Sequence, residues 1–147
     1  MTAPHPDGAG AREALLRALA DADAEPAEVD FVNAHGTGTP LNDAAEAAAL
    51  RAVFGARSGS IPVTSTKAAI GHLLGSAGAV EAVVTVLCLT RLEVHPMPEV
   101  GKPDAALGLD LVIGRPRLLS RALCAVSTSL AFGGANAAIV FRRAEIA

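Results

Sequence analysis

The 147-residue chain contains no tryptophan and no tyrosine, and aromatic residues make up only 3% of it. Hydrophobic residues nevertheless reach 51%, so the apolar surface comes from alanine and aliphatic side chains. This composition excludes an intrinsically disordered chain, because the apolar surface is large enough to offset the entropy lost on ordering. The length fits one domain of ordinary size, and residues 1–147 are treated as a single domain.

The sequence also lacks a block of basic residues and a long apolar run. It has 12 Lys and Arg against 15 Asp and Glu, which gives a net charge of −3. A nucleic-acid partner is not expected, since affinity for a phosphate backbone depends on clustered positive charge. The longest apolar stretch, 79–89, is shorter than the roughly 20 residues of a membrane helix, so no membrane partner is expected either.

The chain has only two cysteines, Cys88 and Cys124, and they do not form a CxxC pair. This usage indicates a reducing compartment, and we expect a cytoplasmic protein in which both thiols are inert core residues. The glycines match neither the GxGxxG nor the GxxxxGK[ST] pattern, which argues against a nucleotide-binding loop. The four histidines are scattered without metal-ligand spacing, so no metal site is predicted.

Hydrophobic periodicity predicts helices that alternate with strands, followed by strands alone. The helices are expected over 8–24, 40–54 and about 79–90, and the strands over 29–32, 61–64, 111–113, 122–130 and 136–141. The last two strands are joined across 131–135 and are expected to form a hairpin. Three prolines between 93 and 110 predict an irregular crossing loop there. This order indicates an α/β fold, with a mixed sheet and helices packed on its faces.

Two details of these helices can be predicted as well. Asn42 or Asp43 is suited to cap the second helix, and Gly55 is suited to end it. In the third helix the aliphatic residues at helical spacing are expected to form the buried face. They are Val80, Val83, Val84 and Leu87.

Two loops that follow predicted strands carry candidate functional side chains. His35 follows the first strand, and His72 follows the second, five positions after Lys67. Strand ends are where α/β sheets build their sites, so the three side chains are expected to converge. Imidazole N–H groups there could stabilise negative charge on a thioester oxygen. Lys67 should have a carboxylate partner, whereas His5 and His95 lie near prolines and are expected to be solvated.

Three blocks of this sequence resemble the signatures of β-ketoacyl synthases in order and spacing. The blocks are Asn-Ala-His-Gly-Thr-Gly-Thr-Pro from Asn33 to Pro40, followed by Asp43 and Glu46, then Ser65 to Gly78, and Phe-Gly-Gly-Ala-Asn from Phe132 to Asn136. The similarity runs over about residues 1–143 and is greatest to the discrete 3-oxoacyl-(acyl-carrier-protein) synthase II type and its polyketide relatives.

The resemblance implies a thiolase-like fold and three catalytic residues. His35 and His72 would bind the malonyl thioester carbonyl during decarboxylation. Lys67 would organise His72 and nearby carboxylates. The implied reaction is the decarboxylative Claisen condensation of acyl and malonyl groups in fatty acid or polyketide biosynthesis.

The resemblance also implies how substrate is presented. Thr37 and Thr39 would contact the phosphopantetheine arm of acyl carrier protein, which carries the substrate. Phe132, with Gly133 and Gly134, would form a gate beside the nucleophile. No covalently bound cofactor is implied, and acyl carrier protein becomes an expected partner.

Synthases of this family are about twice this length or more, and their nucleophilic cysteine lies in the first of two similar halves. Neither cysteine of this chain suits that role, so we expect a C-terminal half that lacks its first strand. It would act as an acyltransferase only when complemented by an N-terminal half that brings the catalytic cysteine. The expected protein partner is that half or a full ketosynthase subunit, so an oligomer is expected. The alternatives are a non-catalytic partner resembling chain-length factors, which tend to lose the histidines kept here, and an inactive fragment.

Overall fold

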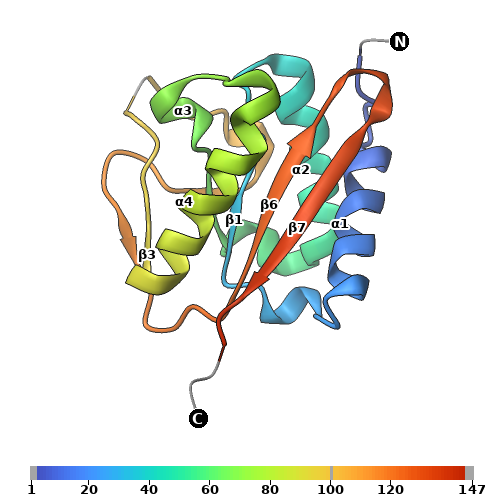
Figure 1. The fold of residues 1–147 in the computed structure, drawn as a ribbon. Coiled ribbons are helices and arrows are strands. Elements are labelled where there is room, and N and C mark those ends of the chain that lie inside the picture. Colours follow the sequence, from blue (N-terminus) through green and yellow to red (C-terminus); the bar gives the residue numbers. More distant parts are fainter. Residues whose placement is uncertain (1–2, 100, 145–147) are drawn as a thin grey trace.

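The fold comes from a computed structural model, which describes residues 3–99 and 101–144 (Figure 1). Helices and strands alternate from α1 to β2, two helices follow, and all five strands after α4 come without a further α-helix, close to the order that periodicity predicts. The α-helices are α1 (Ala9–Asp21), α2 (Pro40–Phe54), α3 (Lys67–Ile70) and α4 (Ala77–Arg91). The strands are β1 (Phe31–Asn33), β2 (Pro62–Thr64), β3 (Glu93–Val94), β4 (Asp110–Leu111), β5 (Arg117–Leu118), β6 (Cys124–Leu130) and β7 (Asn136–Arg142). Single 3₁₀ turns span Pro26–Glu28, Gly55–Gly59, Leu74–Ser76, Ala105–Leu107 and Phe132–Gly134.

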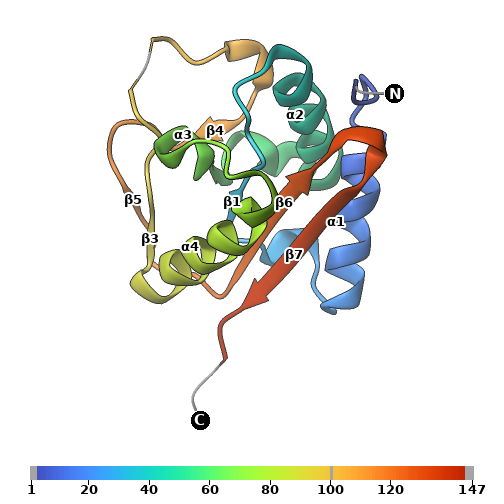
Figure 2. The ribbon, with the colours of Figure 1, turned by 45° about the horizontal axis from the view of Figure 1, so that its top comes forward.

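The main sheet is mixed, and its strands follow the order β4-β2-β1-β6-β7. The first four strands run parallel, with Val32 of β1 opposite Val63 of β2 and Val126 of β6. β7 runs antiparallel to β6 along all seven of its residues, which confirms the predicted hairpin (Figure 2). β3 and β5 form a separate antiparallel ribbon.

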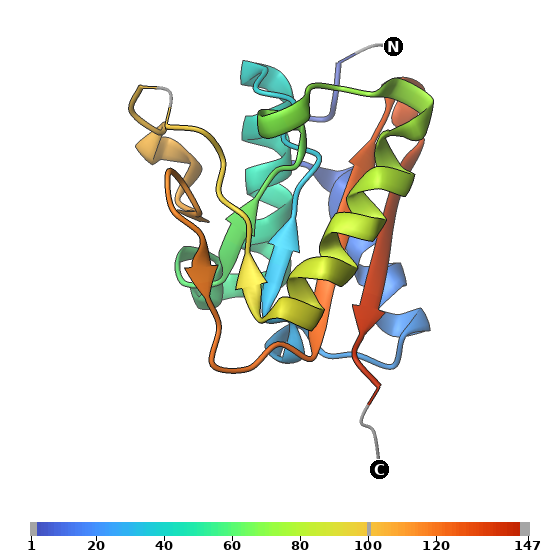
Figure 3. The same ribbon diagram turned by 60° about the vertical axis from the view of Figure 1, so that its left-hand side comes forward.

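Helices cover both faces of the sheet (Figure 3). α1 and α2 pack on one face, and α4 packs on the other together with the ribbon of β3 and β5. Successive strand residues point to opposite faces. Val32 accordingly lies in the core beneath α1 and α2, whereas Phe31 lies in the core beneath α4. The expected α/β class is confirmed.

The boundaries of α2 agree with the sequence, but its cap does not. The helix spans Pro40–Phe54 and ends at Gly55, which has a positive φ of 55°. Its N-cap residue is Thr39, and Pro40 takes the first helical position, where a missing N–H costs nothing. The prediction that Asn42 or Asp43 caps α2 is therefore wrong. Asp43 lies inside the first turn, and its carboxylate accepts the N–H of Gly38 at 3.2 Å.

The buried face of α4 is only partly the one that the aliphatic pattern predicts. Val84 packs against the core and Val80 is half-buried, but Val83 and Leu87 are exposed. Glu81 and Thr85 are buried, whereas Val83, Val86 and Leu87 are 60%, 42% and 43% exposed. The polar side chains face inward because Thr85 contacts Asn33 at the end of β1 and Glu81 pairs with Lys67 at the start of α3. By length and composition alone, the stretch Leu74–Arg91 could also cross a membrane. Here its buried face combines Glu81 and Thr85 with Ala77, Cys88 and Leu89, and an aliphatic stripe on the other side stays exposed.

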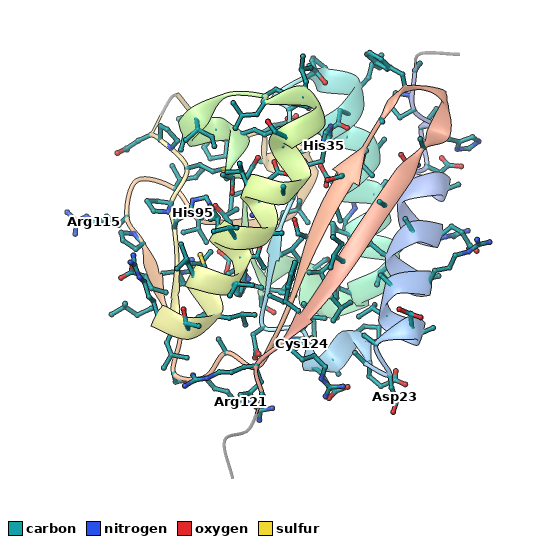
Figure 4. The ribbon with its side chains drawn as sticks, viewed as in Figure 1. Asp23, His35, His95, Arg115, Arg121 and Cys124 are labelled. Atoms are coloured by element: carbon teal, nitrogen blue, oxygen red, sulfur yellow. The ribbon has the colours of Figure 1, made fainter. Side chains whose placement is uncertain are left out.

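Three short elements lie where the sequence indicates only loops. They are α3, β3 and β5, each of two to four residues. Elements this short show no periodicity, so only pairing with distant residues reveals them. The prediction that His95 is solvated is also wrong. His95 follows β3, is half-buried, and has both ring nitrogens within hydrogen-bonding distance of neighbours (Figure 4).

Candidate active site

The candidate site lies at the carboxyl ends of the parallel strands. β1 ends at Asn33 and β2 ends at Thr64, so the segments that leave them start from the same edge of the sheet. Asn33 faces α4, because its side-chain amide contacts Thr85 and the backbone of Glu81. His35 lies two residues further on and is only 6% exposed (Figure 4).

The backbone around His35 is held by a buried carboxyl group of α2. Glu46 accepts the N–H groups of His35 and Gly36, each at 2.9 Å. The hydroxyl of Thr128 on β6 donates to the same carboxyl at 2.6 Å. Burial raises the pKa of Glu46, and these hydrogen bonds oppose the rise. Glu46 on α2 is therefore bonded both to the loop that follows β1 and to β6, directly behind the candidate catalytic histidine.

Gly36 is required at this loop for two reasons. Its φ is +44°, a conformation that side-chain-bearing residues rarely adopt. A Cβ at this position would also lie 2.6 Å from the Cβ of Ser65, on the neighbouring loop. Glycine therefore permits the two site-bearing loops to approach each other closely.

Lys67 begins α3 and forms a buried ion pair with Glu81 of α4. The side chains of Lys67 and Glu81 are 4% and 2% exposed, so water screens the pair little. The prediction that Lys67 has a carboxylate partner is confirmed. One carboxylate oxygen of Glu81, Oε2, is buried and has no hydrogen-bond partner among the described residues.

His35 and His72 meet, as the positions of their loops predict. Their ring centroids lie 5.4 Å apart, with the planes nearly perpendicular at 86°. Nδ1 of His72 accepts the N–H of Leu74 at 3.1 Å, so the neutral ring carries its proton on Nε2. Burial, and then the charges of Lys67 and His72, lower the pKa of His35 to about 4. His35 is therefore a neutral imidazole at pH 7, able to donate one N–H.

The residues predicted to contact substrate lie at the same edge of the sheet. The hydroxyls of Thr37 and Thr39 are 3.0 Å apart on the exposed loop after His35. Phe132 is 80% exposed at the tip of the hairpin of β6 and β7. Gly133 and Gly134 follow it with φ of +78° and +82°. Because β6 runs parallel to β1, the hairpin tip is at the His35 end of the sheet.

The sequence missed two residues that support the site. Thr128 lies on β6 and is recognisable only through its contact with Glu46. His95 lies on a proline-containing segment and contacts Thr66, the residue before Lys67. The one available signal for Thr128 was a run of three polar residues, 127–129, near the end of β6. No pattern in the sequence points to His95.

The low pKa of His35 predicts a specific loss of stability in acid. Between pH 6.5 and about 4 the unfolded chain binds a proton at His35 and the folded chain does not. The free energy of unfolding should therefore fall as the pH is lowered from 6.5 to 4, by on the order of 3 kcal/mol from this residue. Urea unfolding of the chain and of His35→Asn across this range measures it. Equal pH dependence in both would contradict the prediction.

The fold and this arrangement of histidines, lysine and buried carboxyl groups define a thiolase-like α/β domain. Residues 1–100 match the family described as Beta-ketoacyl synthase, C-terminal domain. The chain belongs to this family. The resemblance read from the three motifs is thereby confirmed.

Curated relatives agree with this membership. The chain is 42% identical over 143 residues to 3-oxoacyl-[acyl-carrier-protein] synthase 2 of Synechocystis sp., covering 97% of this chain and 34% of that protein. It is 40% identical to the protein of the same name from Staphylococcus aureus strain COL, covering 99% of this chain and 35% of that protein. The chain therefore spans about a third of the length of the curated relatives that it matches.

Solved structures show the same fold. A type II polyketide acyl-carrier protein in complex with its ketosynthase, bound to a hexaketide, matches with a TM-score of 0.93 and 32% identity, covering 99% of this chain and 35% of that one. A β-ketoacyl synthase from Burkholderia phymatum matches with a TM-score of 0.88 and 36% identity, covering 99% and 34%. A ketosynthase in complex with its chain length factor from Xenorhabdus doucetiae matches with a TM-score of 0.80 and 36% identity, covering 98% of this chain and 36% of that one.

Proposed function

We propose that this chain is the C-terminal part of a β-ketoacyl synthase of fatty acid or polyketide synthesis. It would act with an N-terminal part that supplies the nucleophilic cysteine. The observation that carries the proposal is the pairing of His35 with His72 beside the buried Lys67. Cys88 and Cys124 are buried, and burial raises the pKa of both thiols, so neither suits the nucleophile.

The histidine pair suits the decarboxylation of a malonyl thioester. When carbon dioxide leaves, the bond between the carboxyl carbon and the α-carbon breaks, and its electron pair passes to the thioester carbonyl. The oxygen becomes an enolate oxygen, which two imidazole N–H groups can stabilise. The α-carbon then attacks the acyl thioester on the partner's cysteine, and the cysteine thiolate leaves. The low pKa of His35 and the Nε2 proton of His72 both favour this role.

The partner surface is proposed to be the uncovered side of α4. Val83, Val86 and Leu87 lie at helical spacing and are exposed there, and Ile139 of β7 is exposed at 50%. Contiguous exposed apolar patches on soluble proteins mark interaction sites. β7 also ends the sheet, so its outer edge has no described strand beside it. An N-terminal part would cover both features, and the relatives have about twice this chain's length remaining for it.

Acyl carrier protein is the proposed carrier of both substrates. The paired hydroxyls of Thr37 and Thr39 are exposed at the site edge, where they could bind the polar phosphopantetheine arm. Phe132 at the hairpin tip would gate the acyl group. The buried, unpaired cysteines are compatible with work in the cytoplasm, where thiols stay reduced.

Complementation tests this function. The chain would be combined with an N-terminal part of the Synechocystis relative that contains its cysteine, and condensation of acyl and malonyl groups on acyl carrier protein would be measured. We expect product from the mixture and none from either part alone. Condensation by the isolated chain would contradict the proposal. A complex with a complete synthase whose rate is unchanged by His35→Ala would instead favour a non-catalytic, chain-length-factor-like subunit.

A further inference from the structure

His95 lies outside the matched motifs, yet its ring contacts the hydrogen-bonded residues behind the site. Nε2 of His95 lies 3.2 Å from the hydroxyl of Thr66, and Nδ1 lies 3.3 Å from the carbonyl of Pro96 and 3.4 Å from the hydroxyl of Thr64. Thr66 in turn bonds to Asn33. Asn33 and Thr66 immediately precede the segments that hold His35 and Lys67.

The neighbours of Nδ1 decide which ring nitrogen carries the proton. The carbonyl of Pro96 can only accept a hydrogen bond. The hydroxyl of Thr64 donates its own proton to the carbonyl of His95 at 2.8 Å, so its oxygen can only accept from the ring. Nδ1 therefore carries the proton, and Nε2 of the neutral ring is an acceptor. Burial lowers the pKa of His95, which favours the neutral ring at pH 7.

An acceptor at Nε2 sets the direction of the bonds that follow. The hydroxyl of Thr66 has two acceptors at 3.2 Å, Nε2 of His95 and Oδ1 of Asn33. Oδ1 already accepts the backbone N–H of Thr66, whereas Nε2 has no other donor among the described residues, so the hydroxyl donates to His95 and its oxygen accepts the amide N–H of Asn33 at 2.9 Å. The amide oxygen of Asn33 accepts the backbone N–H of Thr66 at 3.2 Å. The second amide proton of Asn33 points to the hydroxyl of Thr85 at 3.1 Å, which donates to the carbonyl of Glu81. Every one of these donors and acceptors has a partner.

The backbone on both sides of His95 is anchored, so the ring has a defined place. Val94 is fully buried and pairs with Arg117 in the ribbon of β3 and β5. The N–H of Met97 donates to the carbonyl of Val112 at 2.8 Å. The ring is thereby held over the end of β2, against the face of the sheet that α4 covers.

We propose that His95 is a positioning residue. By accepting the Thr66 hydroxyl at Nε2, it fixes the orientation of the Asn33 amide, which joins β1, the start of α3 and α4. His35 follows β1 by two residues, Lys67 begins α3, and Glu81 lies on α4. The consequence for decarboxylation rests on the proposed function, whereas the consequence for the geometry of His35 and Lys67 does not.

The test compares His95→Gln with His95→Asn. The longer Gln side chain can present an amide oxygen to Thr66, and the shorter Asn reaches only the Nδ1 position. The first readout is the imidazole titration of His35 followed by NMR in the whole chain. The second is malonyl decarboxylation in the complex with the N-terminal part. His5→Ala is the matched control, since His5 is an exposed histidine far from these bonds.

We expect His95→Asn to raise the titration midpoint of His35. The positive charge of Lys67 disfavours protonation of the His35 ring, and Lys67 is then held less firmly near it. We also expect kcat for decarboxylation to fall about tenfold with little change in KM, as loss of support behind a catalytic group usually causes. His95→Gln should keep both the His35 titration midpoint and kcat close to their values in the unchanged protein. Equal behaviour of Gln, Asn and the His5 control would overturn the proposal, as would equal damage by Gln and Asn. If decarboxylation is absent in every protein, the proposed function fails, and the titration alone decides the role of His95.

Discussion

Replacing His35 with alanine should lower the rate of malonyl decarboxylation by about 10²–10³-fold in the complex with an N-terminal part. The expected loss is the usual effect of removing one preorganised donor to a developing oxyanion. The imidazole of His35 is buried and neutral, and Glu46 holds the backbone N–H of His35, so the ring is a preorganised donor. Decarboxylation would be measured as carbon dioxide released from malonyl-acyl carrier protein.

Controls separate this loss from a failure to fold. His35→Asn retains a side-chain N–H donor and should lose less activity than His35→Ala. His72→Ala should cause a comparable loss, and the double variant should lose little more than either single variant if the two rings act on one oxygen. His5→Ala should keep the full rate. A His35→Ala protein that folds and decarboxylates normally would remove the basis of the proposed function.

Removing one partner of the buried ion pair should have the largest effect on stability. Lys67→Met leaves the carboxylate of Glu81 buried without a counter-charge, with one oxygen that already lacks a partner. Breaking a buried pair in this way typically lowers the free energy of unfolding by about 3–5 kcal/mol. Urea unfolding of the isolated chain at pH 7 measures the change.

A double variant identifies the cause of this loss. Lys67→Met combined with Glu81→Leu removes both charges, and the free energy of unfolding should recover most of the loss seen in Lys67→Met. The exposed pair of Glu13 and Arg17 on α1 provides the matched control, and Arg17→Met should leave stability nearly unchanged. If the double variant were as unstable as Lys67→Met alone, packing rather than an uncompensated charge would explain the effect.

The same pair links stability to the titration of His35. Lys67 is the leading charge that lowers the pKa of His35, so Lys67→Met should also move that pKa upward. The upward shift would leave His35 partly protonated at pH values where the native ring is neutral. Lys67 is therefore suited to keep a hydrogen-bond donor neutral as well as to hold α3 against α4.

Sequence patterns predicted the parts of the fold that local chemistry decides. Pro40 and Gly55 bracket α2 because one lacks an N–H and the other tolerates positive φ, and both properties are visible in the residue alone. The hairpin of β6 and β7 follows from two apolar runs separated by glycines. The convergence of His35 and His72 follows from their place after parallel strands, because such strands end at one edge.

The orientation of α4 could not be predicted from periodicity. An aliphatic stripe indicates the face that avoids water, but it does not say which surface covers it. The ion pair of Glu81 with Lys67 and the bonds of Thr85 with Asn33 turn the polar face toward the sheet. The stripe of Val83, Val86 and Leu87 therefore faces outward, and this exposure is the basis for expecting a partner.

The sequence by itself determined the family, the candidate catalytic residues and the carboxyl edge of the sheet as the place of the site. These depend on residue identity, spacing and the direction of neighbouring strands. Only the tertiary structure decided that Glu46 holds the backbone of His35, that Glu81 pairs with Lys67, and that His95 contacts Thr66. Each of these contacts joins residues 11 to 29 positions apart, and a buried polar group takes the partner that folding brings to it.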